Sequence, residues 1–173
     1  ESWLKKLDEN KKISLYIHVP FCSSICYFCA CHTSVVNKYK PIENYVSLLL
    51  KEIDILGEKL KSKFNVSHIH FGGGTPSILK GAELWLIMQS IKKRFNILKD
   101  CKIAMEIDPR FFKQNLTIIL NDCGFDRISI GVQDFSQNVQ TLINRKQSFE
   151  ITKETVNHLR ENNISNINID LIY

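Results

Sequence analysis

The sequence predicts an α/β fold in which a parallel sheet curves into a partial barrel. Short runs rich in β-branched residues alternate with longer segments whose apolar residues recur every three or four positions. Within each run, apolar side chains occupy one parity and polar side chains the other. The chain has 173 residues, about one domain's worth. This alternating order favours parallel strands joined by right-handed crossovers.

Five strands are expected, and their polar faces carry the functional signal. They are Ile13–Val19, Val66–Phe71, Ile103–Ile107, Arg127–Val132 and Asn166–Tyr173. Tyr16, Glu106 and Asp170 all fall on the polar parity, where burial without partners would be costly. We therefore expect a curved sheet or open barrel whose concave side holds polar ligands and water. A sheet with one face open to solvent is the alternative.

Helical periodicity fills the connections between these strands. The expected helices are Glu43–Leu60, Ala82–Phe95, Phe112–Asp122 and Ser148–Asn162. Gly124 follows the third helix, where a left-handed residue commonly ends a helix. Ser148 is the expected N-cap of the fourth. The arrangement is that of about five βα units of a TIM-like barrel, whose chemistry lies at the carboxyl ends of the strands.

The expected organisation is an N-terminal extension, residues 1–12, followed by a core barrel, residues 13–173. We expect the barrel to be cut before a sixth βα unit and to lack a C-terminal domain. The extension has no apolar signal-peptide core, and no apolar run is long enough for a membrane span, so a cytoplasmic protein is expected. The net charge of +5 clusters on helical faces, which argues against nucleic-acid binding.

Cysteine spacing gives the strongest chemical signal. Structural disulfides are rare in a reducing compartment, so six cysteines point to metal or redox chemistry. Cys22, Cys26 and Cys29 supply three thiols from one loop after the first strand, and an iron–sulfur cubane held by three thiolates keeps one iron open. A zinc site completed by Cys31 or His32 is an alternative, although no second cysteine pair exists. Cys101 and Cys123 are expected in the core.

The loop Cys22-Ser-Ser-Ile-Cys26-Tyr-Phe-Cys29 resembles the cluster loop of the radical S-adenosylmethionine (SAM) superfamily. Further segments resemble the oxygen-independent coproporphyrinogen III oxidase family within it. They are Tyr16-Ile-His-Val-Pro-Phe-Cys22, Cys31, Gly72-Gly-Gly-Thr-Pro76, Glu106-Ile-Asp-Pro-Arg110, Gly131-Val-Gln-Asp134, Asn144-Arg145 and Asn168-Ile-Asp-Leu-Ile-Tyr173. The resemblance covers nearly the whole chain.

The resemblance implies a [4Fe–4S] cluster on Cys22, Cys26 and Cys29 and two molecules of SAM. The first SAM is implied near Tyr16, Gly73 and Glu106, and the second near Gly74, Thr75, Gln133, Arg145 and Asp170; Phe28 also fits the cofactor pattern. Catalytic roles are implied for Tyr16, Cys31 and Glu106. The alternative for Glu106 and Asp170 is that they do not contact a cofactor but form internal ion pairs with His70 or Arg110.

The implied reaction removes two propionate carboxyl groups from coproporphyrinogen III. Reductive cleavage of SAM yields a 5′-deoxyadenosyl radical that abstracts hydrogen, and loss of carbon dioxide and one electron leaves a vinyl group. The product is protoporphyrinogen IX, in haem biosynthesis. The partners implied are the porphyrinogen, an electron donor and an electron acceptor, and a monomer is expected. A haem-binding chaperone of the same superfamily is the main alternative, and Cys31 and Arg145 favour the enzyme over it.

Overall fold

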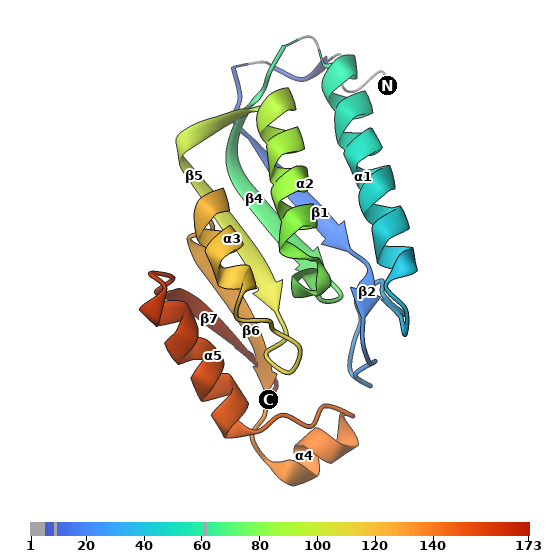
Figure 1. Ribbon diagram of the computed structural model, residues 1–173, viewed down its shortest axis with the longest axis vertical. Helices are drawn as coiled ribbons and strands as arrows, with labels where there is room; N and C mark the ends of the chain where they lie inside the picture. Colours follow the sequence, from blue (N-terminus) through green and yellow to red (C-terminus); the bar gives the residue numbers. More distant parts are fainter. Residues whose placement is uncertain (1–5, 9, 61) are drawn as a thin grey trace.

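Five parallel strands form the main sheet of the computed structural model, which describes residues 6–8, 10–60 and 62–173 (Figure 1). In spatial order they are β1 (Ile13–Val19), β4 (Asn65–Gly73), β5 (Asn96–Ile107), β6 (Arg127–Gln133) and β7 (Asn166–Leu171). Every neighbouring pair is parallel. All five predicted strands are confirmed, and consecutive strands lie side by side as expected for repeated βα units.

One strand begins earlier than predicted. β5 starts at Asn96, which pairs with Asn65, and its register against β4 then shifts between Val66 and His68. The irregular stretch that follows is polar and hides the period-two pattern. Cys101 lies in it and is only partly buried, packed against the edge of the core, whereas Cys123 is buried in the core as predicted.

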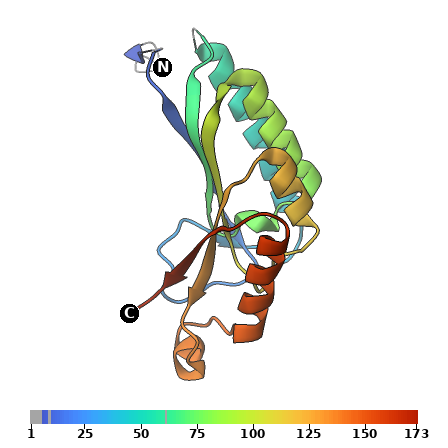
Figure 2. The same ribbon diagram turned by 90° about the vertical axis from the view of Figure 1, so that its left-hand side faces the viewer.

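Helices cover one face of this sheet (Figure 2). They are α1 (Lys40–Lys59), α2 (Gly81–Arg94), α3 (Leu116–Cys123) and α5 (Phe149–Glu161), with a short 3₁₀ helix at Pro76–Ile78. α4 (Gln137–Leu142) lies beyond the carboxyl end of β6 (Figure 1). Gly124 ends α3 with φ +85°, and Ser148 caps α5 by accepting a hydrogen bond from the Ile151 amide, as predicted. α3 begins later than expected because the chain first turns at Asp108, where the Phe111 amide bonds the Asp108 carbonyl oxygen.

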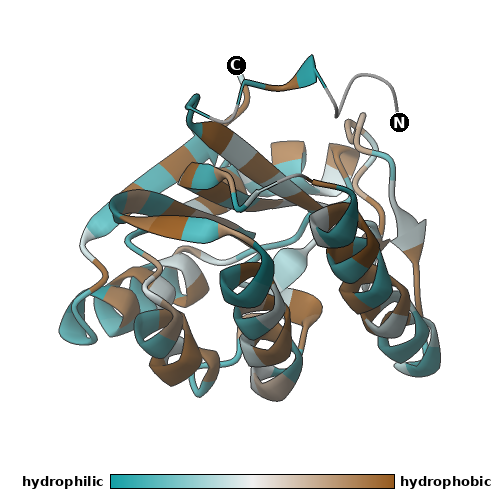
Figure 3. Cartoon of the chain, turned by 90° about the horizontal axis from the view of Figure 1, so that it is seen from above, coloured by the Kyte–Doolittle hydropathy of each residue, from teal (hydrophilic) through white to brown (hydrophobic). Residues whose placement is uncertain are grey.

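The core fills the space between the sheet and these helices. Val19, Phe71 and Met105 from the strands are fully buried against Leu84 and Leu120 from the helices. Hydrophobic and hydrophilic stripes alternate along each helix (Figure 3). The opposite face of the sheet carries the polar side chains of the strands, and it faces the loop that follows β1. The predicted segregation of side chains is therefore confirmed.

The loop after β1 has a small sheet of its own at its base. β2 (Phe21–Cys22) pairs in parallel with β3 (Ser34–Val35), and this pair closes the ends of the cysteine-bearing segment. Within the predicted extension 1–12, residues 1–5 and 9 lie outside the described residues. Among the residues that the structure places, no helix has the length and apolar content to span a bilayer.

Candidate cluster and cofactor site

A cavity of about 240 Å³ lies at the carboxyl ends of the strands. Its lining includes every predicted site residue except Tyr16: Cys22, Cys26, Phe28, Cys29, Cys31, Gly73, Gly74, Thr75, Glu106, Gln133, Arg145 and Asp170. The loop after β1 and the ends of β4, β5, β6 and β7 all contribute. Residues that are up to 148 positions apart in sequence thus meet where barrel enzymes place their chemistry.

The sulfur of Cys22 accepts two hydroxyl hydrogen bonds. Thr33 Oγ1 lies 3.3 Å from it, and Thr75 Oγ1 lies 3.4 Å from it. The Thr75 amide also donates to the Phe21 carbonyl oxygen at 2.8 Å, which fixes the glycine-rich turn against the cysteine loop. A sulfur that accepts two donors is suited to the thiolate form, which is the form that binds metal.

The sulfur of Cys26 accepts charged donors instead. Arg145 Nη1 lies 3.6 Å from it and Arg110 Nη2 lies 3.8 Å from it. Both guanidinium groups also bond Asp108, which is 6% exposed. Burial lowers the pKa of Arg110, but its hydrogen bond and charge contact with Asp108 raise it by more, so it stays cationic. Two cations and one carboxylate leave one positive charge in excess beside the sulfur of Cys26.

Cys29 and Cys31 lie next to each other. Burial, followed by the charge of Cys29 and a hydrogen bond with it, raises the pKa of the Cys31 thiol. All six cysteines are free thiols. Within the described ranges, no three histidine, cysteine, aspartate or glutamate side chains come close enough to hold one metal ion.

This donor set fits a cubane better than a zinc ion. Zinc needs its ligands within about 2.3 Å of one point, whereas a cubane takes one thiolate at each iron, so its cysteines stand farther apart. The hydrogen bonds and the positive charge at Cys22 and Cys26 suit thiolates on a cluster. The residues present therefore fit a [4Fe–4S] group with three protein ligands.

The glycine-rich turn after β4 brings backbone close to both the strands and the loop. Gly73 has φ +112°, a conformation that favours glycine. Its amide donates to Glu106 Oε2 at 3.2 Å. A Cβ on Gly74 would lie 2.5 Å from both the Phe21 carbonyl oxygen and Thr33 Oγ1, so no side chain fits there.

Tyr16 lies beside the cavity on the polar face of β1. Its ring stacks on His70 with centroids 5.8 Å apart, and its hydroxyl lies 3.0 Å from His18 Nδ1. Burial and the nearby Glu106 carboxylate raise its pKa. His70 Nε2 lies 2.9 Å from Glu106 Oε1, so the internal pairing considered as an alternative for Glu106 is present. That pair is about 40% exposed on both side chains, which leaves Glu106 reachable by a ligand.

Three of the residues predicted for a second SAM come from the carboxyl ends of β6 and β7 and from the segment after α4: Gln133, Asp170 and Arg145. Gln133 has φ +72° at a bulge that ends β6. Asp170 accepts hydrogen bonds from Ser129 and Asn168 rather than from Arg110. Arg145 bonds the Gly131 carbonyl oxygen through Nη2 at 2.6 Å, and its buried Nε has no hydrogen-bond partner. Because both Nη atoms are engaged, a two-point contact of Arg145 with a ligand carboxylate would require Arg145 to move.

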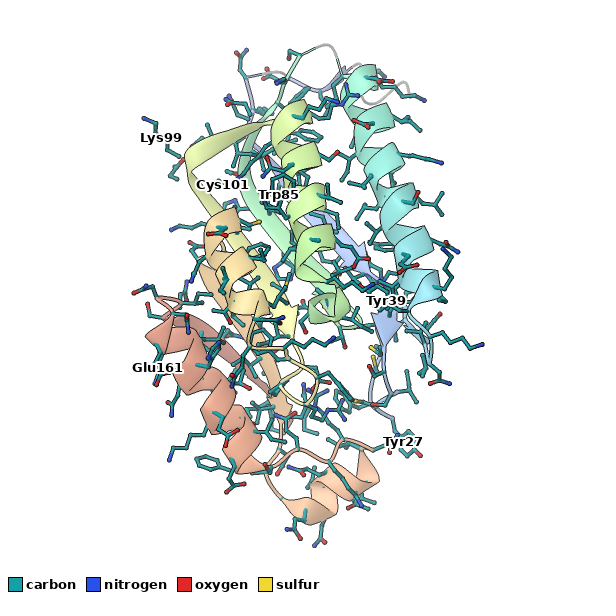
Figure 4. All side chains as sticks on the ribbon, viewed as in Figure 1. Tyr27, Tyr39, Trp85, Lys99, Cys101 and Glu161 are labelled. Carbon is teal, nitrogen blue, oxygen red and sulfur yellow. The ribbon has the colours of Figure 1, made fainter. Side chains whose placement is uncertain are left out.

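Two sets of neighbours were not assigned from the sequence. Asp108 and Arg110 line the cavity, and Arg110 contacts Cys26. The sequence held a signal for both, because they come directly after a strand. Asn144 donates to the Ile25 carbonyl oxygen at 2.8 Å, and the Tyr27 amide donates to the Ile143 carbonyl oxygen at 3.0 Å. Figure 4 shows Tyr27 in the part of the molecule near α4.

Comparisons with known proteins agree with this geometry. The family model described as the radical SAM superfamily matches residues 16–173. An oxygen-independent coproporphyrinogen III oxidase of Bradyrhizobium diazoefficiens is 42% identical over 171 residues, which make up 99% of this chain and 38% of that protein. The protein of the same description from Escherichia coli is 39% identical over 164 residues, or 95% of this chain and 36% of that protein. The chain thus spans well under half the length of these relatives.

A solved structure shares the fold closely. It is coproporphyrinogen III oxidase from Escherichia coli, described as a radical SAM enzyme, and it superposes with a TM-score of 0.92 at 37% identity. The match covers 99% of this chain and 40% of that one. The predicted partial barrel is confirmed by this match.

Proposed function

The chain belongs to the radical SAM superfamily, and from that membership we propose that the whole protein catalyses oxygen-independent decarboxylation of coproporphyrinogen III. The observation that carries the proposal is the cavity, where a three-cysteine loop meets polar side chains from four strand ends. The names of the relatives supply the substrate class. The product is protoporphyrinogen IX, and the protein acts in haem biosynthesis.

Cys22, Cys26 and Cys29 hold the cluster in this proposal. Threonine hydroxyls bond the sulfur of Cys22, guanidinium groups bond the sulfur of Cys26, and these contacts orient both sulfurs. When bound, the reduced cluster and SAM together supply an oxidant that removes hydrogen from a propionate side chain. The protein positions these groups and excludes water, since the cofactors carry the difficult chemistry.

The remaining cavity residues bind two SAM molecules in this proposal. Glu106 accepts hydrogen bonds from the first, and the Gly73 backbone approaches it closely. Tyr16, on β1, limits the position of the first SAM. Gln133, Arg145 and Asp170 hold the second, together with Gly74, Thr75 and Phe28. Cys31, whose thiol lies next to Cys29, has a catalytic role in this proposal and is not a ligand of the cluster.

The surroundings of the reaction are part of the same proposal. An electron donor must reduce the cluster, and an acceptor must take the electron released with carbon dioxide. Six free thiols suit a reducing cytoplasm. We propose that the protein works there as a monomer on a porphyrinogen.

Anaerobic turnover tests the function directly. Full-length protein with coproporphyrinogen III, SAM, a reductant and an electron acceptor should release carbon dioxide and yield protoporphyrinogen IX. Haem binding without turnover would instead support a chaperone, and a colourless protein with stoichiometric zinc would refute both. Cys26→Ala should lose iron and SAM cleavage, and retained cleavage would contradict the ligand assignment.

Arg145→Ala tests the second SAM site separately. Loss of this guanidinium should lower the number of SAM molecules bound from two to one while the cluster absorbance remains. Equilibrium dialysis on the iron-loaded protein measures this number. An unchanged number would show that Arg145 does not hold SAM.

A further inference from the structure

Two cationic side chains reach the sulfur of one predicted cluster ligand. Arg110 Nη2 and Arg145 Nη1 lie 3.8 Å and 3.6 Å from Cys26 Sγ. The contacts link residues 84 and 119 positions apart in sequence, so they depend on the tertiary fold. Arg145 already belongs to the proposed SAM site, whereas Arg110 has no role assigned so far.

Asp108 holds Arg110 in this position. Arg110 Nε donates to Asp108 Oδ1 at 3.0 Å, and Arg110 Nη2 donates to Oδ2 at 2.6 Å, a two-point contact. The two side chains are 12% and 8% exposed, so solvent screens the pair little. One guanidinium nitrogen is thereby kept against the sulfur with little freedom to turn away.

Cys22, another predicted ligand of the cluster, has a different environment. Cys22 accepts only from the neutral hydroxyls of Thr33 and Thr75 among the contacts described. Positive charge is therefore concentrated at one corner of the proposed cluster. Hydrogen bonds and positive charge next to a cluster sulfur stabilise the more negative, reduced state.

We propose that Arg110, held by Asp108, is a positioning residue that raises the reduction potential of the cluster through Cys26. This inference rests on the proposed function. The negative charge of Asp108 acts in the opposite direction and lowers the potential. The potential with both side chains present therefore lies between the values expected with either charge alone. Removal of the positive charge of Arg110 must then lower the potential, and removal of the negative charge of Asp108 must raise it.

The test uses full-length protein reconstituted anaerobically without SAM. At the wild-type midpoint, the ratio of reduced to oxidised cluster is read by electron paramagnetic resonance. Arg110→Met should lower this ratio about tenfold, which is about 59 mV for a one-electron couple. Arg110→Lys keeps the charge and should lower it less. Asp108→Asn should raise it.

Arg94→Met is the matched control. Arg94 on α2 is also ion-paired, to Asp54 at 2.7 Å and to Glu58 at 2.9 Å, but it lies outside the cavity lining. Its loss should leave the ratio unchanged. If ion-paired arginines contributed only to the stability of the fold, Arg110→Met and Arg94→Met would change the ratio of reduced to oxidised cluster alike.

The outcomes separate the two proposals. If the wild type holds no cluster, the proposed function fails. If the wild type holds a cluster and the ratio stays within about twofold of its value in all three variants, or shifts in one direction in all of them, Arg110 does not set the potential. If Arg110→Met takes up no iron, Arg110→Lys and Asp108→Asn decide by their opposite shifts.

Discussion

Gly74 lies where the turn after β4 packs against the cysteine loop, and no room is left there for a side chain. A Cβ there would lie 2.5 Å from the Phe21 carbonyl oxygen, which cannot move without breaking the bond from the Thr75 amide. We expect Gly74→Ala to lower the free energy of unfolding by about 1–3 kcal/mol, the usual cost of overpacking. It should also lower iron content, because Thr75 would shift away from Cys22. Urea unfolding and iron analysis measure the two effects.

Gly124→Ala is the control for that substitution. Gly124 has φ +85°, a backbone conformation that favours glycine, but a Cβ there meets only Ile103 Cδ1 at 3.8 Å. Alanine should cost about 1–2 kcal/mol for the left-handed backbone alone. Iron content should be unchanged. Equal iron loss in both variants would mean that stability, not the contact with the cysteine loop, controls cluster binding.

At the scale of elements, the segment after α4 holds the cysteine loop. Ile143, Asn144 and Arg145 each bond one of Tyr27, Ile25 and Cys26. Three consecutive residues thus contact three consecutive residues of the loop. Asn144 has φ +54°, which asparagine tolerates better than most residues. The loop is therefore positioned by a connection more than a hundred residues away in sequence.

Asn144→Ala should loosen this connection. It removes the amide that bonds the Ile25 carbonyl oxygen and places alanine at positive φ. Hydrogen exchange at the Tyr27 amide should become faster by about five- to tenfold, since local opening becomes easier by roughly 1 kcal/mol. Asn144→Gly removes the side chain and keeps the backbone preference, so it isolates the hydrogen bond. Unchanged exchange in both variants would show that the contact does not hold the loop.

Strong periodicity explains which elements were predictable. Segregation at period two marked all five strands, and apolar spacing marked four helices. α4 was missed because six residues, Gln137–Leu142, carry too few apolar positions to show a period, and β2 and β3 have two residues each. Short elements of this kind are set by tertiary contacts, such as the pairing of Cys22 with Val35.

The candidate site was predictable where a local pattern or a resemblance carried it. The cysteine spacing, the polar strand ends and the family resemblance named twelve of the eighteen residues that line the cavity in advance. The role of Arg110 was not predictable, because its contact with Cys26 spans 84 residues and no local spacing encodes it. The partner of Asp170 was likewise unforeseen, since Ser129 reaches it from a neighbouring strand.

The molecule as a whole depends on α1 staying fixed to the end of β1, near the cysteine loop. Tyr39, labelled in Figure 4 where α1 begins, donates to Glu83 on α2. Tyr45 on α1 donates to the His18 carbonyl oxygen at 2.5 Å, and its ring meets Phe21 edge-on with centroids 5.5 Å apart. These contacts join the helical layer to the strand that leads into the loop.

This arrangement makes global stability sensitive to alkaline pH. Burial, with a smaller effect from the charge of Glu52, raises the pKa of Tyr45 to about 12 from an ordinary value near 10.0. The unfolded chain releases that proton first, so the stabilisation is complete below pH 10 and is lost as pH rises through about 12. With solvent screening of the partly exposed ring, the loss is roughly 1–2 kcal/mol.

Tyr45→Phe should remove this part of the pH dependence. At neutral pH the variant should be less stable by about 1 kcal/mol, because the bond to His18 is lost. Between pH 10 and pH 12 its free energy of unfolding should fall less steeply than that of the wild type, so the two curves converge. Tyr27→Phe, which alters a ring that is 73% exposed, should keep the wild-type slope. If the Tyr45→Phe curve instead stays parallel to the wild-type curve, the hydroxyl ionises as readily in the folded chain as in the unfolded one, and the alkaline loss must arise from other groups.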